Sequence, residues 1–182
     1  DIATCLYAGI WSDTGSLISA TKRTFEILGK CLDLGVEPNK IVRALRSTNT
    51  TEIKLVGKFM SNVQKFFNGK VLVTKAEYKD FAGENVSDEE IGEVKEKALG
   101  QLTFSSDTYI QSFIYEYLPR QVSISIRSFH PLHSYDISKI AKAMGGGGHP
   151  GASSARFSGT PDEAEKLFLE TAPKVYPDLL ES

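Results

Sequence analysis

Four consecutive glycines, Gly145 to Gly148, limit the folds open to this 182-residue chain more than any other local feature. Each glycine inside a helix or strand costs about 0.5 to 1 kcal/mol relative to alanine, so the run is not expected within either. An amphipathic segment, residues 136–144, precedes the glycines, and a segment with strand character, residues 152–157, follows them. The sequence therefore predicts a glycine turn between a short helix and a strand.

The residues around this turn are suited to binding an anion. Glycine N–H groups can form anion-binding nests, and His149 adds a donor or proton carrier that works near neutral pH. No Lys-Ser/Thr pair follows, so the turn is not a P-loop. Arg127 ends the polar face of an alternating strand, residues 121–129, and its planar guanidinium matches phosphate. Two interpretations are open: Arg127 and His149 converge on one anion, or a flexible turn lies beside an arginine in a surface ion pair.

Asp13 is a separate candidate ligand. It lies in a Ser-Asp-Thr-Gly turn after an apolar segment, residues 2–10, which could be a helix or a strand. A carboxylate in this position could bind Mg²⁺ or Mn²⁺. An aspartate beside threonine and glycine is also common as a helix cap or Asx turn. Both interpretations are open.

Two further groups of residues could carry chemistry. His130 and His133 are three residues apart, but no second pair of metal ligands accompanies them, so they are interpreted as loop residues. An aromatic run could stack on nucleic-acid bases, although its alternating spacing is also typical of a strand in the core. This run consists of Tyr109, Phe113, Tyr115 and Tyr117.

Composition excludes several classes of function. The chain has 21 lysine and arginine residues against 23 aspartate and glutamate residues, a net charge of -2. This argues against a basic tail and against binding duplex DNA by bulk charge. The two cysteines form no CxxC pair, which argues against a zinc cluster or disulfide scaffold. No transmembrane helix or signal peptide is visible, so we expect a cytoplasmic protein that does not bind membranes.

Periodicity divides the chain into two parts. Residues 1–68 show helical spacing, with helices expected at 21–34, from Pro38, and from about residue 50 to 67. Strand and helix patterns alternate after residue 69. We therefore predict an α/β (α+β) chain with domains at 1–68 and 69–182, the second containing a mixed β-sheet with flanking helices. The chain begins without methionine inside an apolar segment, so an N-terminal part is expected to be missing.

Together these motifs resemble the DHH/DHHA1 phosphoesterase family. The Arg127-Ser128 strand end, the helix at 136–144 and the block Gly145–Ala152 are similar to the DHHA1 domain. The Asp13-Thr14-Gly15 block resembles the last metal-binding motif of the DHH domain. The resemblance covers nearly the whole chain and is greatest to the nanoRNase and pAp-phosphatase group.

The resemblance implies a manganese-dependent hydrolase for short oligonucleotides or 3′-phosphoadenosine 5′-phosphate (pAp), with a two-metal mechanism in which Mg²⁺ could replace Mn²⁺. Asp13 would be a metal ligand. The DHHA1 part would close over the substrate about a hinge near residue 69. The residues implied to hold the substrate are Arg127, Ser128, Gly146, Gly147, Gly148 and His149.

Two departures from the family pattern matter. The other metal-binding motifs, including the DHH triplet, lie upstream in the family and are absent here, so the chain is expected to be catalytically incomplete. After the histidine loop the family often has Ala-x-Gly, whereas this chain has Ala152-Ser153-Ser154.

Several functions are alternatives to hydrolysis of short oligonucleotides or pAp. Two alternatives belong to the same family: a cyclic-dinucleotide phosphodiesterase and a single-strand exonuclease of the recJ type. Two others are not enzymes: a non-catalytic DHHA1 module that binds nucleic acid and a structural α+β domain. The expected partner is a short single-stranded oligonucleotide or a nucleotide, and the chain could form a homodimer.

Overall fold

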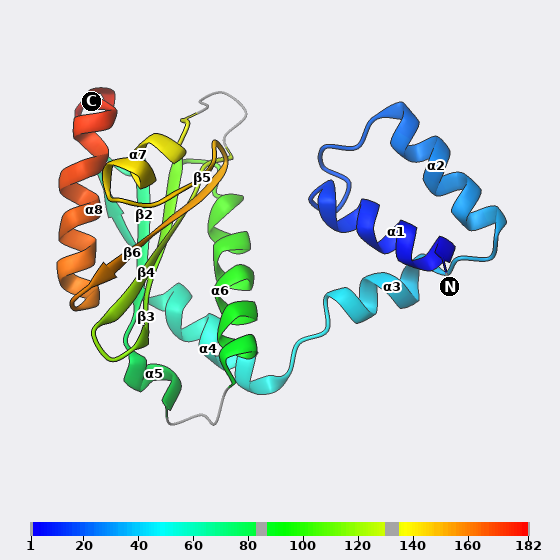
Figure 1. Cartoon of the computed structure of the whole chain (residues 1–182), viewed down its shortest axis with the longest axis horizontal. Coiled ribbons are helices and arrows are strands. Elements are labelled where there is room, and N and C mark those ends of the chain that lie inside the picture. The colour runs from blue at the N-terminus through cyan, green and yellow to red at the C-terminus, as the bar shows by residue number, and fades with distance from the viewer. Residues whose placement is uncertain (1, 83–86, 130–134, 182) are drawn as a thin grey trace. The chain divides into compact units, whose positions relative to one another are not determined.

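The structure is a computed structural model that describes residues 2–82, 87–129 and 135–181 (Figure 1). It divides into two compact units, Asp1–Asn49 and Thr50–Ser182. The predicted loop histidines, His130 and His133, lie outside the described residues. None of the described helices combines the length and the apolar character needed to cross a membrane.

The first unit contains three helices, α1 (Ile2–Asp13), α2 (Lys22–Asp33) and α3 (Pro38–Leu45). The apolar segment at 2–10 is therefore a helix. Thr21 caps α2, because its side chain accepts a hydrogen bond from the N–H of Thr24, and a proline begins α3. The small core of this unit is made by residues from all three helices and their connections: Tyr7, Leu28, Cys31, Val36 and Ile41.

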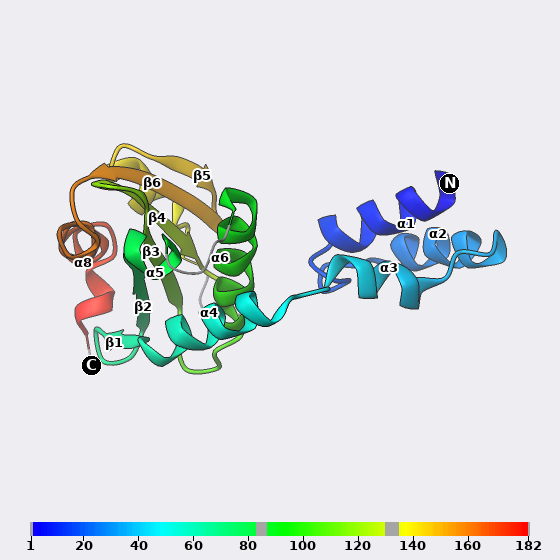
Figure 2. The ribbon, with the colours of Figure 1, turned by 90° about the horizontal axis from the view of Figure 1, so that it is seen from below.

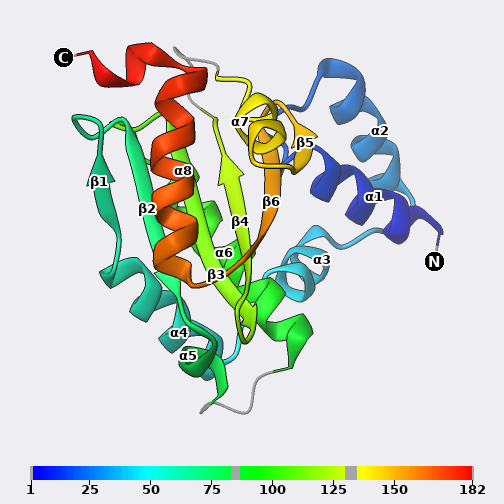
Figure 3. The same cartoon turned by 60° about the vertical axis from the view of Figure 1, so that its left-hand side comes forward.

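The second unit is built on a six-stranded mixed sheet with the strand order β1-β2-β3-β4-β6-β5 (Figures 1 and 3). β2 and β3 are parallel, and the other neighbouring strands are antiparallel. The predicted α/β (α+β) fold is confirmed. The strands are β1 (Gln64–Phe66), β2 (Val71–Ala76), β3 (Ile110–Leu118), β4 (Gln121–Arg127), β5 (Gly147–His149) and β6 (Ala152–Ser158).

Helices cover both faces of the sheet (Figure 2). On one face lie α7 (Ser138–Ala143) and α8 (Pro161–Val175), followed by the 3-10 helix η1 (Pro177–Leu180). On the other face, α4 (Thr50–Ser61) and α6 (Asp88–Thr103) pack over β2 and β3.

Capping explains where two of these helices begin. Ser87 and Glu90 form a reciprocal capping box at the start of α6, and Thr160 and Glu163 form one at the start of α8. The short helix α5 (Tyr78–Ala82) connects β2 to the segment before α6.

The second compact unit begins earlier than the predicted boundary at residues 68–69. The predicted helix from about residue 50 to 67 ends at Ser61, and β1 follows it. Leu55 and Phe59 of α4 are buried in the same cluster as residues of α6 and β3, so α4 packs with the sheet. The assignment of residues 69–182 to a DHHA1 domain stays a prediction.

The hinge predicted near residue 69 coincides with the turn between β1 and β2. Phe67, Asn68 and Gly69 have left-handed φ values of 52°, 55° and 87°. The turn is tied down, because the Asn68 side-chain amide donates to the carbonyl of Glu181 at 3.3 Å. This place is a hairpin inside one compact unit rather than a hinge between two.

Candidate functional site

Three antiparallel strands place two of the predicted binding residues in one row across the sheet. Arg127 on β4 pairs with Ala152 on β6, and Ala152 pairs with His149 on β5. Paired residues point to the same face, and neighbouring strands lie about 4.8 Å apart, so the backbones of Arg127 and His149 are about 10 Å apart. The strand register thus puts these two side chains on one face, within reach of one ligand.

A shallow pocket of about 230 Å³ lies on this part of the sheet. Three of the predicted residues line it: Arg127, Gly147 and Gly148. Cations, hydroxyl groups and open glycine backbone are the groups that bind phosphate in proteins. The pocket also contains residues that the sequence did not single out, namely Lys95, Ser125, Ala152, Ser153 and Ser154.

Arg127 forms an ion pair with Glu96 of α6. One guanidinium nitrogen, Nη2, donates to the two carboxylate oxygens at 3.0 and 3.1 Å, and Nη1 donates to the carbonyl of Ile126 at 3.2 Å. Lys95 Nζ lies 3.0 Å from the same carboxylate. Burial opposes ionisation of Glu96, but the charges and hydrogen bonds of Arg127 and Lys95 outweigh it and lower the pKa of this carboxyl group. The surface ion pair that was one interpretation of Arg127 is therefore present, and it borders the pocket.

Ser128 and Gly146 make internal contacts. Ser128 is buried, and its Oγ donates to the carbonyl of Tyr109 at 2.9 Å. The Gly146 N–H donates to the carbonyl of Ala141 at 2.8 Å, which closes the C-terminal end of α7. A Cβ atom on Gly146 would lie 2.1 Å from the carbonyl oxygen of Ser154, so only glycine allows this approach to β6. Both residues thus have structural roles independent of any ligand.

The other glycines of the run differ from one another in their surroundings. The turn is confined to the start of the glycine run, where Gly145 has a φ of 80°. Gly147 and Gly148 belong to the edge strand β5, because they pair with β6. A Cβ atom on Gly148 would lie 2.6 Å from the carbonyl oxygen of Ala152, whereas Gly147 has no atom within 4 Å of that position. Gly147 therefore presents open backbone to the pocket.

His149 is exposed at the end of β5. Its carbonyl oxygen accepts a hydrogen bond from Ser153 Oγ at 2.7 Å, which fixes the strand but not the ring. Its imidazole makes no hydrogen bond to any residue that the structure describes. The ring is therefore free to turn toward a ligand in the same row as Arg127.

Asp13 lies in the first unit, where it is the exposed last residue of α1. The turn after it is ordered by Thr14, whose Oγ1 donates to the carbonyl of Ile10 at 2.7 Å. Within residues 2–82, 87–129 and 135–181, no group of three or more histidine, cysteine, aspartate or glutamate side chains could hold a metal ion. A metal ion such as Mg²⁺ or Ca²⁺ requires about six ligands, of which several come from the protein or its substrate. One exposed carboxylate does not fit a two-metal centre.

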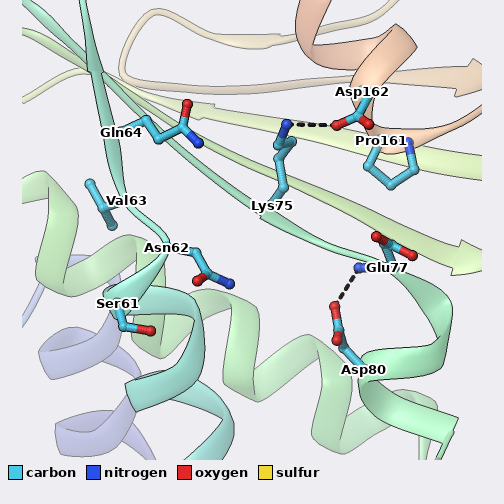
Figure 4. A pocket seen from close by; sticks show the side chains of 9 residues that line it. All are labelled: Ser61, Asn62, Val63, Gln64, Lys75, Glu77, Asp80, Pro161 and Asp162. Carbon is cyan, nitrogen blue, oxygen red and sulfur yellow. Dashed lines mark hydrogen bonds and ion pairs between the residues drawn. The ribbon is translucent and has the colours of Figure 1, made fainter.

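A larger pocket of about 470 Å³ lies beside β2 and the start of α8 (Figure 4). Its lysine, Lys75, is neutralised by Asp162 at 2.7 Å and by Glu165 at 2.6 Å. Burial lowers the pKa of Lys75, but the hydrogen bonds and charges of these two carboxylates outweigh burial and raise the pKa. Lys75 therefore stays positively charged. Glu77 and Asp80 also line the pocket, where they pair with Lys79 at 2.6 Å and with Lys58 at 2.7 Å. This pocket disfavours phosphate, despite its size.

No family model matches the chain. Over 93% of its length the chain is 27% identical to the bifunctional oligoribonuclease and PAP phosphatase NrnA of Thermus thermophilus, of which it covers 49%. It is 29% identical over 92% of its length to the protein of the same name from Bacillus subtilis, of which it covers 51%. The chain is similar to the NrnA proteins. The predicted resemblance to the nanoRNase and pAp-phosphatase group is thereby confirmed, and the chain spans about half the length of these curated relatives.

A solved structure supports the fold. The structure of an exopolyphosphatase-related protein from Bacteroides fragilis matches 98% of this chain with a TM-score of 0.85, and the match covers 52% of that protein. The two sequences are 23% identical, so this likeness establishes the fold and not the activity.

Proposed function

We propose that this chain is the substrate-binding part of an NrnA-like phosphoesterase that acts on short single-stranded oligonucleotides or on pAp. The observation that carries the proposal is the pocket in which Arg127, Lys95 and the Gly147 backbone meet. These groups come from β4, α6 and β5, which are far apart in the sequence. The names of the NrnA proteins give an oligoribonuclease and a PAP phosphatase activity. pAp carries terminal phosphates, and an oligoribonucleotide with a 5′-phosphate offers the same group.

Phosphate would bind by replacing the carboxylate of Glu96 at Arg127. The side chain of Glu96 is 54% exposed and that of Arg127 is 23% exposed, so water partly screens their ion pair. A terminal phosphate carries more charge than a carboxylate and offers three acceptor oxygens to the guanidinium, to Lys95 and to Ser125. Because His149 lies in the same row as Arg127, it would donate to the phosphate or to the group next to it. These residues bind and orient the substrate.

We propose that hydrolysis depends on manganese, or on magnesium in its place, with Asp13 as one ligand. The described residues include no group of three or more histidine, cysteine, aspartate or glutamate side chains that could hold a metal ion, so no catalytic step is assigned to this chain. A cytoplasmic location and a homodimer also stay predictions.

Replacing Arg127 with alanine is expected to weaken the binding of pAp to the 182-residue chain. Charge-assisted hydrogen bonds contribute about 1.5 to 3 kcal/mol each, so the Kd should rise roughly 10- to 150-fold. Titration calorimetry with pAp and no added metal measures this directly. E96Q should have the opposite effect and lower the Kd, because it removes the anion that competes for Arg127.

The matched control is K166A. Lys166 lies on α8, on the opposite side of the sheet, and its side chain is 78% exposed. This variant loses one positive charge far from the pocket and should bind pAp like the unaltered chain. The assignment of the pocket fails if R127A and K166A bind pAp equally well.

The chain alone is expected to release no AMP from 5′-phosphorylated diadenosine RNA in the presence of Mn²⁺. The physical reason is that Asp13 by itself cannot hold two metal ions. Chromatography of the nucleotides measures the release, and the NrnA protein of Bacillus subtilis serves as a positive control for the assay. AMP released by the chain would mean that a complete metal site is assembled after all.

A further inference from the structure

The sheet face that contains the pocket continues into a second polar strip along the same strands. Tyr115 on β3 pairs with Ser123 on β4, and Ser123 pairs with Arg156 on β6, so these three side chains form one row. Ser123 is four residues from Arg127 on β4, which is about 13 Å along a strand. The strip is therefore too far from Arg127 for one small phosphate group to touch both.

Tyr117 extends this row toward the end of the β3–β4 hairpin. Its ring centroid lies 6.2 Å from that of Tyr115, and the guanidinium carbon of Arg156 lies 5.7 Å from the Tyr117 ring centroid. The register shifts between Glu116 and Leu118, and such a bulge can re-aim the side chain within it. The result is an aromatic ring beside a cation on the sheet face of Arg127.

These two residues are not part of the core. Tyr117 belongs to neither of the apolar clusters that cover the two faces of the sheet, whereas Phe113, four residues earlier, is fully buried in one of them. Arg156 is exposed, and no ion pair involving it occurs among the described residues. On this face α4 and α6 pack mainly over β2 and β3, whereas the helices that pack on β4 and β6 are α8 and α7 on the opposite face. The strip is thus an accessible surface with the groups that bind single-stranded nucleic acid.

We propose that Tyr117 and Arg156 form a second nucleotide subsite, which selects longer oligonucleotides over mononucleotides such as pAp. Tyr117 stacks on a base, and Arg156 contacts the neighbouring phosphate of a strand whose terminal phosphate lies at Arg127. This inference rests on the proposed function of the pocket. The strip lies roughly 13 Å from Arg127 and stacked nucleotides advance about 3.4 Å each, so about four linked nucleotides bring a further base to Tyr117. pAp has a single base, which lies next to its own phosphates, and no further base to place there.

The test compares two ligands on the whole 182-residue chain: pAp and a 5′-phosphorylated pentaadenylate RNA. Y117A should weaken the binding of the pentanucleotide by about tenfold, since a base stacked on an aromatic ring is lost. R156A should weaken it by about fivefold, whereas R156K should recover part of the affinity because the charge is kept. Both alanine variants should bind pAp within twofold of the unaltered chain. Calorimetry gives the affinities, and thermal melting checks that each variant is folded.

The outcomes separate this inference from the proposed function. If the unaltered chain binds neither ligand, the proposed function of the pocket fails. If both ligands bind but Y117A and R156A change neither affinity, or change both equally, the second subsite is disproved, and the contact of Arg156 with Tyr117 only stabilises the hairpin. K166A, on the opposite side of the sheet, is the control for loss of a positive charge and should change neither affinity.

Discussion

Replacing Gly146 with alanine is expected to destabilise the second unit by about 3 kcal/mol, because the new methyl group has no room and overpacking of this kind typically costs 1 to 3 kcal/mol or more. The added Cβ would lie 2.1 Å from the Ser154 carbonyl oxygen and 2.6 Å from the Ala155 Cα atom. Both are backbone atoms of β6, so relief requires moving the strand. Urea denaturation followed by circular dichroism measures the change in the free energy of unfolding.

Gly147 supplies the matched control, because it is the next residue and has open space around it. A Cβ atom at Gly147 would meet nothing within 4 Å, and no positive φ is present there. G147A should therefore change the free energy of unfolding by less than about 1 kcal/mol, as surface substitutions usually do. Equal destabilisation by G146A and G147A would contradict the close approach of Gly146 to β6. The pair of variants separates the structural use of the glycine run from its use in the pocket.

Local sequence patterns predicted some of the elements that surround the pocket but not β5, because the glycine run was expected outside any strand, whereas Gly147 and Gly148 pair with β6. The alternation in residues 121–129 predicts a strand with Arg127 and Ser125 on its polar face, and β4 has this arrangement. The capping boxes at the starts of α6 and α8 likewise involve only residues close in sequence, Ser87 with Glu90 and Thr160 with Glu163. These features depend on residues close in sequence, which is why one sequence is enough to find them.

Tertiary contacts account for what the sequence did not predict. Lys95 lies on α6, and its position in the pocket depends on how this helix packs against the sheet, which no local pattern encodes. The aromatic run shows the same limit. Phe113 is buried and Tyr117 is not, although both have strand spacing, because α6 covers one part of β3 only. The early end of α4 follows from strand pairing, since β1 pairs with β2.

Replacing Phe113 with alanine is expected to lower the free energy of unfolding by about 3 to 5 kcal/mol, the usual cost of truncating a buried phenylalanine. Phe113 is fully buried, and its ring meets that of Phe59 edge-on, with centroids 5.4 Å apart. It thereby joins β3 to α4, in the same cluster as the α6 residues Val94 and Ala98.

The same substitution should also weaken phosphate binding, because α6 carries Lys95 to the pocket. Calorimetry with pAp, run below the melting temperature of F113A, measures this second effect. Y117A is the control, since Tyr117 lies outside the core clusters and its loss should cost less than about 1 kcal/mol. If F113A were as stable as Y117A, that result would contradict the packing of α4 and α6 against Phe113 of β3. If F113A were unstable but bound pAp normally, Lys95 would not contribute to the pocket.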